Sequence, residues 1–193
     1  MEPTDETLVQ RCLNGDTEAF DALVRRYQRP IYNLAYRLTS DPEEANDLAQ
    51  EIFLRVYERL HTFQPEAAFR PWLYRVATNW CLNALKRRRP PTVSLETGGG
   101  IEGEERPLEL PDLVEDPARL AERRELQERV QQAILTLPPK YRIVMLLRYA
   151  QGLSYEEIAT ALEMPLGTVK IHLHRAKAHL KERLRDLYEA YFG

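Results

Sequence analysis

Basic and polar side chains recur with helical spacing near the carboxyl end of the chain. Between Leu166 and Arg185 six residues are Lys or Arg and one is acidic, although the whole chain carries a net charge of −3. One exposed side of a helix here would present Thr168, Lys170, Ile171, His174, Arg175 and Lys177. Side chains of these types contact phosphates and base edges in a DNA major groove. They are candidates for DNA binding, with a merely solvated basic helix as the alternative.

Two short predicted helices would hold these side chains in place. Ser154 and Glu157 form a capping-box pattern that starts the first helix, and Pro165 follows its break. The apolar residues of the second helix recur at helical spacing: Val169, Leu173, Ala176 and Leu180. Two helices joined by a tight turn, the second one basic, are typical of a helix-turn-helix. The pattern therefore predicts DNA as a partner.

A second polar stripe lies on a helix predicted over residues 69–89. Its members recur every three to four residues and continue into a basic run: Arg75, Asn79, Asn83, Lys86, Arg87 and Arg88. Asparagine can make paired hydrogen bonds to a base edge, so this side could follow a DNA strand. Phe63 and Phe69 lie near the ends of the preceding loop, residues 61–68, and are further candidates for contact with this DNA. Trp80 shares the spacing of the apolar residues, which favours a core position over a stacking wedge.

A third candidate surface lies on the helix predicted over residues 42–60. Its inward stripe leaves five residues on other faces: Asp47, Gln50, Glu51, Leu54 and Arg55. Leu54 is an apolar side chain among acids and amides, which indicates a protein-binding patch. A solvated face with one stray leucine is the alternative.

Helical periodicity without strand signals predicts an all-α fold. The segment 90–118 interrupts this periodicity with Pro, Gly and Glu, and residues 94–118 carry one basic and eight acidic groups. Such a composition is typical of a flexible linker. We therefore expect two small helical domains, 1–89 and 119–193, joined by a flexible acidic linker.

Several function classes fit the sequence poorly. No run approaches a membrane span and the acidic amino terminus lacks a signal peptide, so a cytoplasmic protein without membrane insertion is expected. Cys12 and Cys81 form neither a metal motif nor a disulfide framework. His172 and His174 point to different faces of a helix, and no HExxH or glycine-rich phosphate loop occurs. We expect no enzyme activity, no metal and no cofactor.

Three segments in order resemble the extracytoplasmic-function (ECF, group IV) sigma factors of bacteria. They are the helix segment 47–54, the segment 69–79 that begins Phe-Arg-Pro-Trp, and the helix-turn-helix from Gly152 to Lys177. Together they span nearly the whole chain. The resemblance implies an RNA polymerase specificity subunit that binds the core enzyme, recognises two promoter elements and helps to open the DNA.

The resemblance also implies roles for the candidate residues. The 47–55 face would grip the clamp helices of the polymerase β′ subunit, and the β flap would be a further contact. Asn79 falls where the family reads an extruded base of the minus-ten element, and the helix-turn-helix domain would read the minus-thirty-five element. A separate anti-sigma factor is expected as a regulator, and the free protein is expected to be a monomer.

The linker length agrees with this interpretation. About 28 residues reach at most about 90 to 100 Å, whereas promoter elements one and a half DNA turns apart are about 50 Å apart. The reading helix departs from the family, since Lys170, Ile171 and His172 stand where members often have Arg-Ser-Arg. Ile171 offers only an apolar contact, for instance to a thymine methyl. A helix-turn-helix regulator acting without polymerase is the alternative function, although it leaves the 47–55 face and the Arg75 stripe unexplained.

Overall fold

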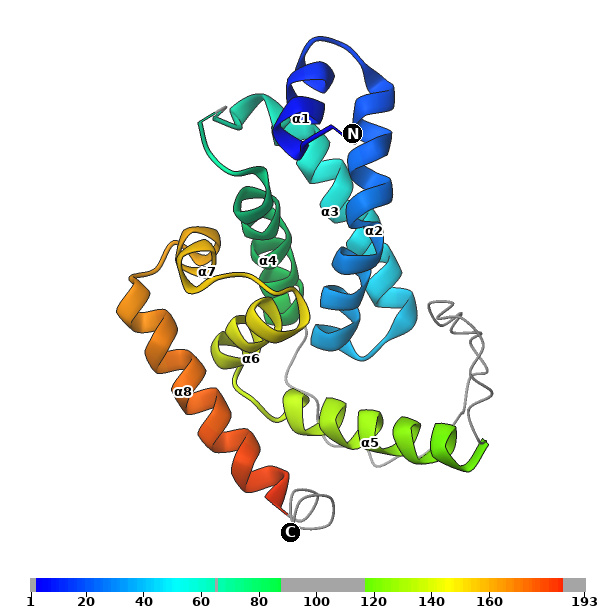
Figure 1. Cartoon of the computed structure of the whole chain (residues 1–193), viewed down its shortest axis with the longest axis vertical. Coiled ribbons are helices and arrows are strands. Elements are labelled where there is room, and N and C mark those ends of the chain that lie inside the picture. Colours follow the sequence, from blue (N-terminus) through cyan, green and yellow to red (C-terminus); the bar gives the residue numbers. More distant parts are fainter. Residues whose placement is uncertain (1–2, 65, 88–116, 186–193) are drawn as a thin grey trace.

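A computed structural model describes residues 3–64, 66–87 and 117–185, with side chains omitted for 117–123. The amino-terminal helices are α1 (Asp5–Leu13), α2 (Thr17–Thr39), α3 (Pro42–Arg59), the 3₁₀ turn η1 (Leu60–Thr62) and α4 (Phe69–Arg87). The carboxyl-terminal ones are α5 (Pro117–Leu135), α6 (Pro139–Met145), the π-helical turn η2 (Leu146–Ala150), α7 (Tyr155–Leu162) and α8 (Leu166–Arg183). No strand occurs in these ranges, which confirms the all-α prediction (Figure 1). Most of the predicted linker lies outside the described residues.

Side-chain caps explain where several helices begin. Asp16 accepts a hydrogen bond from the backbone N–H of Ala19, and Asp41 accepts from those of Glu43 and Glu44. Such bonds satisfy amides that have no partner within the helix. Glu6 of α1 accepts from the backbone N–H of Phe69 at 3.1 Å, so the first turn of α4 is bonded by a side chain distant in sequence.

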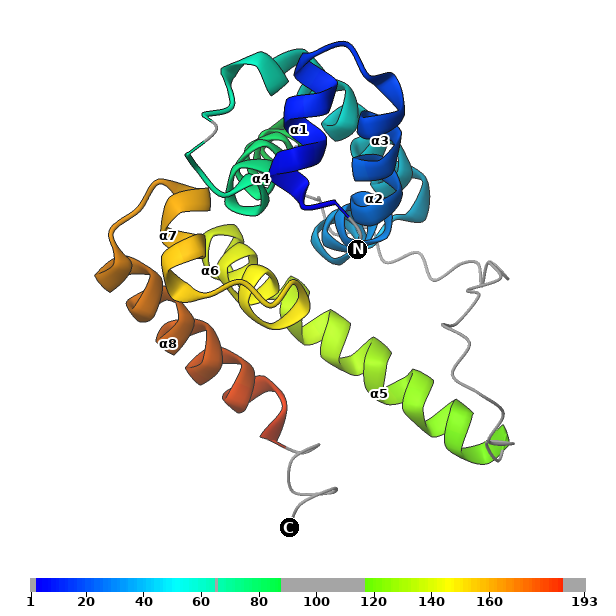
Figure 2. The same cartoon turned by 45° about the horizontal axis from the view of Figure 1, so that its top comes forward.

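Helices α1 to α4 lie together (Figure 2), and their buried apolar side chains belong to one core that continues into α6, η2, α7 and α8. Pro30 does not end α2, which continues to Thr39. The buried side of α3 is formed by Ala45, Leu48, Ala49, Ile52 and Val56. This is the predicted inward stripe except for Phe53, which is only partly buried. The outer side of α3 is left to polar residues, Leu54 and Tyr57.

Helices α6 to α8 form the predicted helix-turn-helix unit. Ser154 and Glu157 make the reciprocal capping box at the start of α7. The inner side of α8 buries Val169, Leu173 and Ala176, which confirms the predicted orientation of this helix, whereas Leu180, also predicted to face inward, is only half-buried. The π-helical turn η2 was not predicted, since the apolar pattern of 143–149 resembles a continuous α-helix.

The two units pack against each other, with α7 beside α4 in both views (Figures 1 and 2). Gln151 bridges them, because its side chain accepts from the Tyr74 hydroxyl at 2.7 Å and donates to the Pro30 carbonyl at 3.2 Å. Arg142 donates to the Leu38 carbonyl at 3.0 Å at the end of α2. The contact therefore combines buried apolar groups with hydrogen bonds to backbone carbonyls.

Candidate nucleic-acid and protein interfaces

Helix α8 presents a basic surface opposite its buried side. Lys170, His174, Arg175 and Lys177 are exposed, and Ile171 is 52% exposed between them. Thr168 is only half-buried near the start of the helix. The buried stripe Val169, Leu173 and Ala176 fixes the rotation of α8, so the residues predicted for the upstream DNA element share its outward surface.

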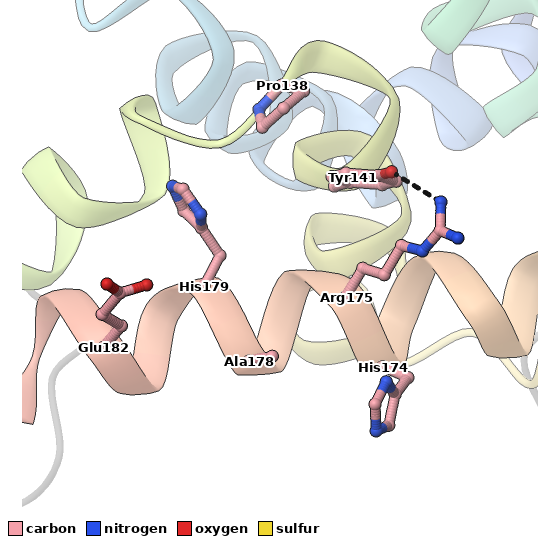
Figure 3. A pocket seen from close by; sticks show the side chains of 7 residues that line it. All are labelled: Pro138, Tyr141, His174, Arg175, Ala178, His179 and Glu182. Atoms are coloured by element: carbon pink, nitrogen blue, oxygen red, sulfur yellow. Dashed lines mark hydrogen bonds between the residues drawn. The ribbon is translucent and has the colours of Figure 1, made fainter.

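Helix α6 supports one flank of this surface, across a shallow groove of about 540 Å³ lined by Pro138, Tyr141, His174, Arg175, Ala178, His179 and Glu182. Figure 3 shows Arg175 directed toward Tyr141 and His174 pointing away from it. The Arg175 guanidinium donates to the Tyr141 hydroxyl at 3.2 Å. This hydrogen bond lowers the pKa of Tyr141. The bond orients Arg175 while leaving most of its donors free for an anion.

Lys177 is oriented on the other flank. Its ammonium lies 5.4 Å from the centre of the Tyr149 ring, a tyrosine that is itself 56% exposed. A hydrogen bond with the Tyr149 hydroxyl raises the pKa of Lys177, which therefore stays charged at neutral pH. Aromatic residues of the neighbouring helix and turn thus position cations on both sides of α8.

The polar stripe of α4 is also on the surface. Arg75, Asn79, Asn83, Lys86 and Arg87 are exposed, in agreement with their predicted placement. Arg88 lies outside the described residues. Arg75 forms an ion pair, because its Nη2 lies 2.6 Å from the carboxylate of Glu163 in the turn between α7 and α8.

Phe63 and Phe69 require a correction, because they are core residues. They are 4% and 1% exposed, respectively, with ring centres 5.8 Å apart. Both also contact Trp72, and Phe69 packs edge-to-face on Tyr27. Aromatic rings gain most from such burial, so these two hold the base of the 61–68 loop and present no surface to DNA here.

Trp80 was predicted to be a core residue and not a stacking wedge on the surface, and its position has features of both. It is half-buried and packs against the core, and its indole N–H donates to Glu51 of α3 at 2.5 Å. The guanidinium groups of Arg55 and Arg87 lie 4.8 and 5.4 Å from its ring centre. Cation–π contacts of this kind join the outer side of α3 to the end of α4.

The outer side of α3 carries a larger apolar patch than the sequence indicated. Leu54 is 64% exposed, as predicted, and Tyr57 one turn away is 53% exposed. Asp47, Gln50 and Glu51 are exposed around them, and Arg55 forms an ion pair with Glu58 at 2.7 Å. Tyr57 was missed, although its spacing of three from Leu54 was a usable signal.

Comparisons with known proteins place the chain in one family. Residues 23–90 match the model of sigma-70 region 2, and residues 127–180 match that of sigma-70 region 4. The RNA polymerase sigma-H factor of Pseudomonas aeruginosa is 41% identical, with 95% of each chain covered. The ECF RNA polymerase sigma factor SigW of Bacillus subtilis is 37% identical over 97% of this chain and 100% of its own.

The chain belongs to the ECF sigma factors of the sigma-70 family. Solved sigma factors share its fold: CnrH, in a complex with the cytosolic domain of CnrY, has a TM-score of 0.71 at 24% identity, covering 94% of this chain and 97% of that one. RpoE of Bartonella quintana, in a complex with the anti-sigma factor NepR, has a TM-score of 0.64 at 20% identity, covering 86% and 96%. Among the described residues of this sigma factor, no helix is long and apolar enough to cross a membrane.

Proposed function

We propose that this ECF sigma factor binds core RNA polymerase through the outer side of α3 and directs it to promoters by reading DNA with α4 and α8. The observation that carries the proposal is the presence, on one chain, of two exposed helix faces suited to DNA and an apolar patch suited to protein. A regulator that binds DNA alone needs only one of these surfaces. We further propose that it acts in the cytoplasm as a specificity subunit without catalysis of its own.

Each surface has a proposed task. Leu54 and Tyr57, ringed by Asp47, Gln50 and Glu51, would dock on the β′ clamp helices, with the β flap contacting the carboxyl-terminal unit. Asn79 would read a minus-ten base, flanked by Arg75, Asn83, Lys86 and Arg87. On α8, the surface defined by Lys170, Ile171, His174, Arg175 and Lys177 would read the minus-thirty-five element. The complex of the related fold RpoE with the anti-sigma factor NepR supports a separate anti-sigma factor as regulator.

Run-off transcription tests the proposal. The full chain is mixed with core polymerase on a library of promoter fragments, and the transcripts are sequenced. We expect promoter-dependent initiation, which Asp47→Arg should weaken by placing a like charge against a partner suited to an acidic surface. Binding of duplex DNA by the chain alone, with no capture of core polymerase, would instead establish a helix-turn-helix regulator.

A further inference from the structure

Glu163 has a backbone conformation that its residue type disfavours. It ends α7 with φ 49° and ψ 46°, in the left-handed region, where helix ends usually place glycine or asparagine. A β-carbon in this region crowds the following carbonyl, so glutamate here costs free energy that glycine would not. A conformation of this kind persists where the surrounding structure holds it, and the Glu163 backbone N–H is held by the carbonyls of Ala159 and Thr160.

The Glu163 side chain contacts the other unit of the molecule. Its carboxylate lies 2.6 Å from Nη2 of Arg75 on α4. In the first turn of α7, the carboxylate of Glu157 lies 3.9 Å from Nη1 of Arg70. Two acids of the helix-turn-helix unit thus face two arginines of α4, so the surfaces are complementary in charge.

Hydrogen bonds beside this pair also join the two units. Arg70 donates to the backbone carbonyl of Gln151, whose side chain bridges Tyr74 and Pro30. These hydrogen bonds can be exchanged for bonds to water, and so each contributes little net free energy to the contact. The pair of Arg75 and Glu163 is itself about half-exposed, with side chains 46% and 58% accessible. The contact also buries apolar side chains of both units in one continuous core, so the ion pair supplements the apolar contact and biases the balance between docked and separated units without setting it alone.

We propose that Glu163 is an intramolecular latch, which helps to hold the helix-turn-helix unit on the side of α4 proposed to read DNA by occupying Arg75. Carboxylate and phosphate bind a guanidinium by the same charge-assisted hydrogen bonds, so Glu163 takes the position that a DNA phosphate would need. Asn79, Asn83 and Lys86 stay exposed, and the latch therefore engages one residue of the stripe. The effect of the latch on DNA binding rests on the proposed function of Arg75 in reading DNA. The effect of the latch on the docking of the two units does not depend on that function.

The test compares two variants of the full chain by small-angle X-ray scattering, without DNA or polymerase. Glu163→Gln keeps the disfavoured backbone and removes the charge, whereas Glu163→Gly removes both. Both should shift the ratio of compact to extended molecules roughly two- to fivefold toward extended ones, the range set by an exposed ion pair. Glu163→Gly should in addition raise the melting temperature of the helix-turn-helix unit, because glycine relieves the strained backbone.

Two further variants separate the latch from a general effect of charge. Glu156→Gln removes an exposed carboxylate from the same helix and should leave the scattering profile unchanged. Arg75→Glu and Glu163→Arg should each extend the molecule, and their combination should restore the compact form. Unchanged scattering for both Glu163 variants, or no recovery in the combined variant, would overturn the latch. Either result leaves the sigma activity to be decided separately by run-off transcription.

Discussion

Truncating Leu54 to alanine should weaken binding of core polymerase while leaving the fold intact. Complete burial of a leucine side chain is worth about 1.5–3 kcal/mol. Since 64% of Leu54 is still exposed in the free chain, about 1–2 kcal/mol of this remains to be gained on docking. Losing it corresponds to a roughly 5- to 30-fold higher Kd. The free energy of unfolding should change by less than about 0.5 kcal/mol, because an exposed side chain contributes little to the core.

The assay is equilibrium binding of the labelled sigma factor to core polymerase, paired with urea unfolding of each variant. Leu13→Ala is a matched control: Leu13 is also an exposed leucine, at 42%, but it lies in α1, outside the proposed docking surface. Leu13→Ala should bind like the wild type. The assignment of the α3 surface fails if Leu54→Ala keeps wild-type affinity, or if both leucine variants lose affinity equally.

Three further changes test other surfaces. Lys170→Ala should weaken upstream-element binding for all sequences and flatten the dependence of log Kd on log salt by about one unit if Lys170 contacts a phosphate, and an unaltered slope would contradict that contact. Asn79→Ala should alter preference at a single minus-ten base and impair promoter opening without lowering the melting temperature, as checked by permanganate footprinting beside thermal denaturation; a collapsed melting temperature would make Asn79 structural. The Glu6 carboxylate accepts hydrogen bonds from its own backbone N–H and from that of Phe69, and these lower the pKa of Glu6 from its ordinary 4.5. The stability that the carboxylate contributes is therefore present above pH 4.5 and is lost as the pH falls through the lowered pKa. Glu6→Gln should therefore lose less free energy of unfolding than the wild type between pH 6 and pH 3, as measured by urea titration. An equal loss in both proteins would show that Glu6 does not contribute to the pH dependence of stability.

Features set by neighbouring residues could be predicted from the sequence. The caps at Asp16, Asp41 and Ser154 act within three residues, so their spacing alone locates the helix starts. The outward surface of α8 follows in the same way from the apolar repeat at Val169 and Leu173. Local periodicity decides which side of a helix meets the core, and that was enough to find most candidate site residues.

Features set by distant residues could not be predicted. Arg75 and Glu163 are far apart along the chain, and nothing near either residue indicates that they pair. Phe63 and Phe69 were expected at DNA because an aromatic residue beside a loop has the same sequence pattern whether it packs inward or outward. Their burial is decided by Tyr27 and Trp72, which only the tertiary structure brings to them.

The placement of α7 between α4 and α8 limits how the two helices proposed to read DNA can cooperate. Packed helices lie about 8–10 Å apart, so two successive contacts separate α4 from α8 by at most about 20 Å where they pack through α7. Promoter elements one and a half turns apart are about 50 Å from each other. A straight duplex cannot meet both helices at once in this arrangement, so a fragment with both elements should gain no avidity over a fragment with one. Binding to one element raises the local concentration of the other only after the helix-turn-helix unit leaves α4. The dependence of affinity on promoter spacing would therefore report on the separated form of the molecule and not on the docked form.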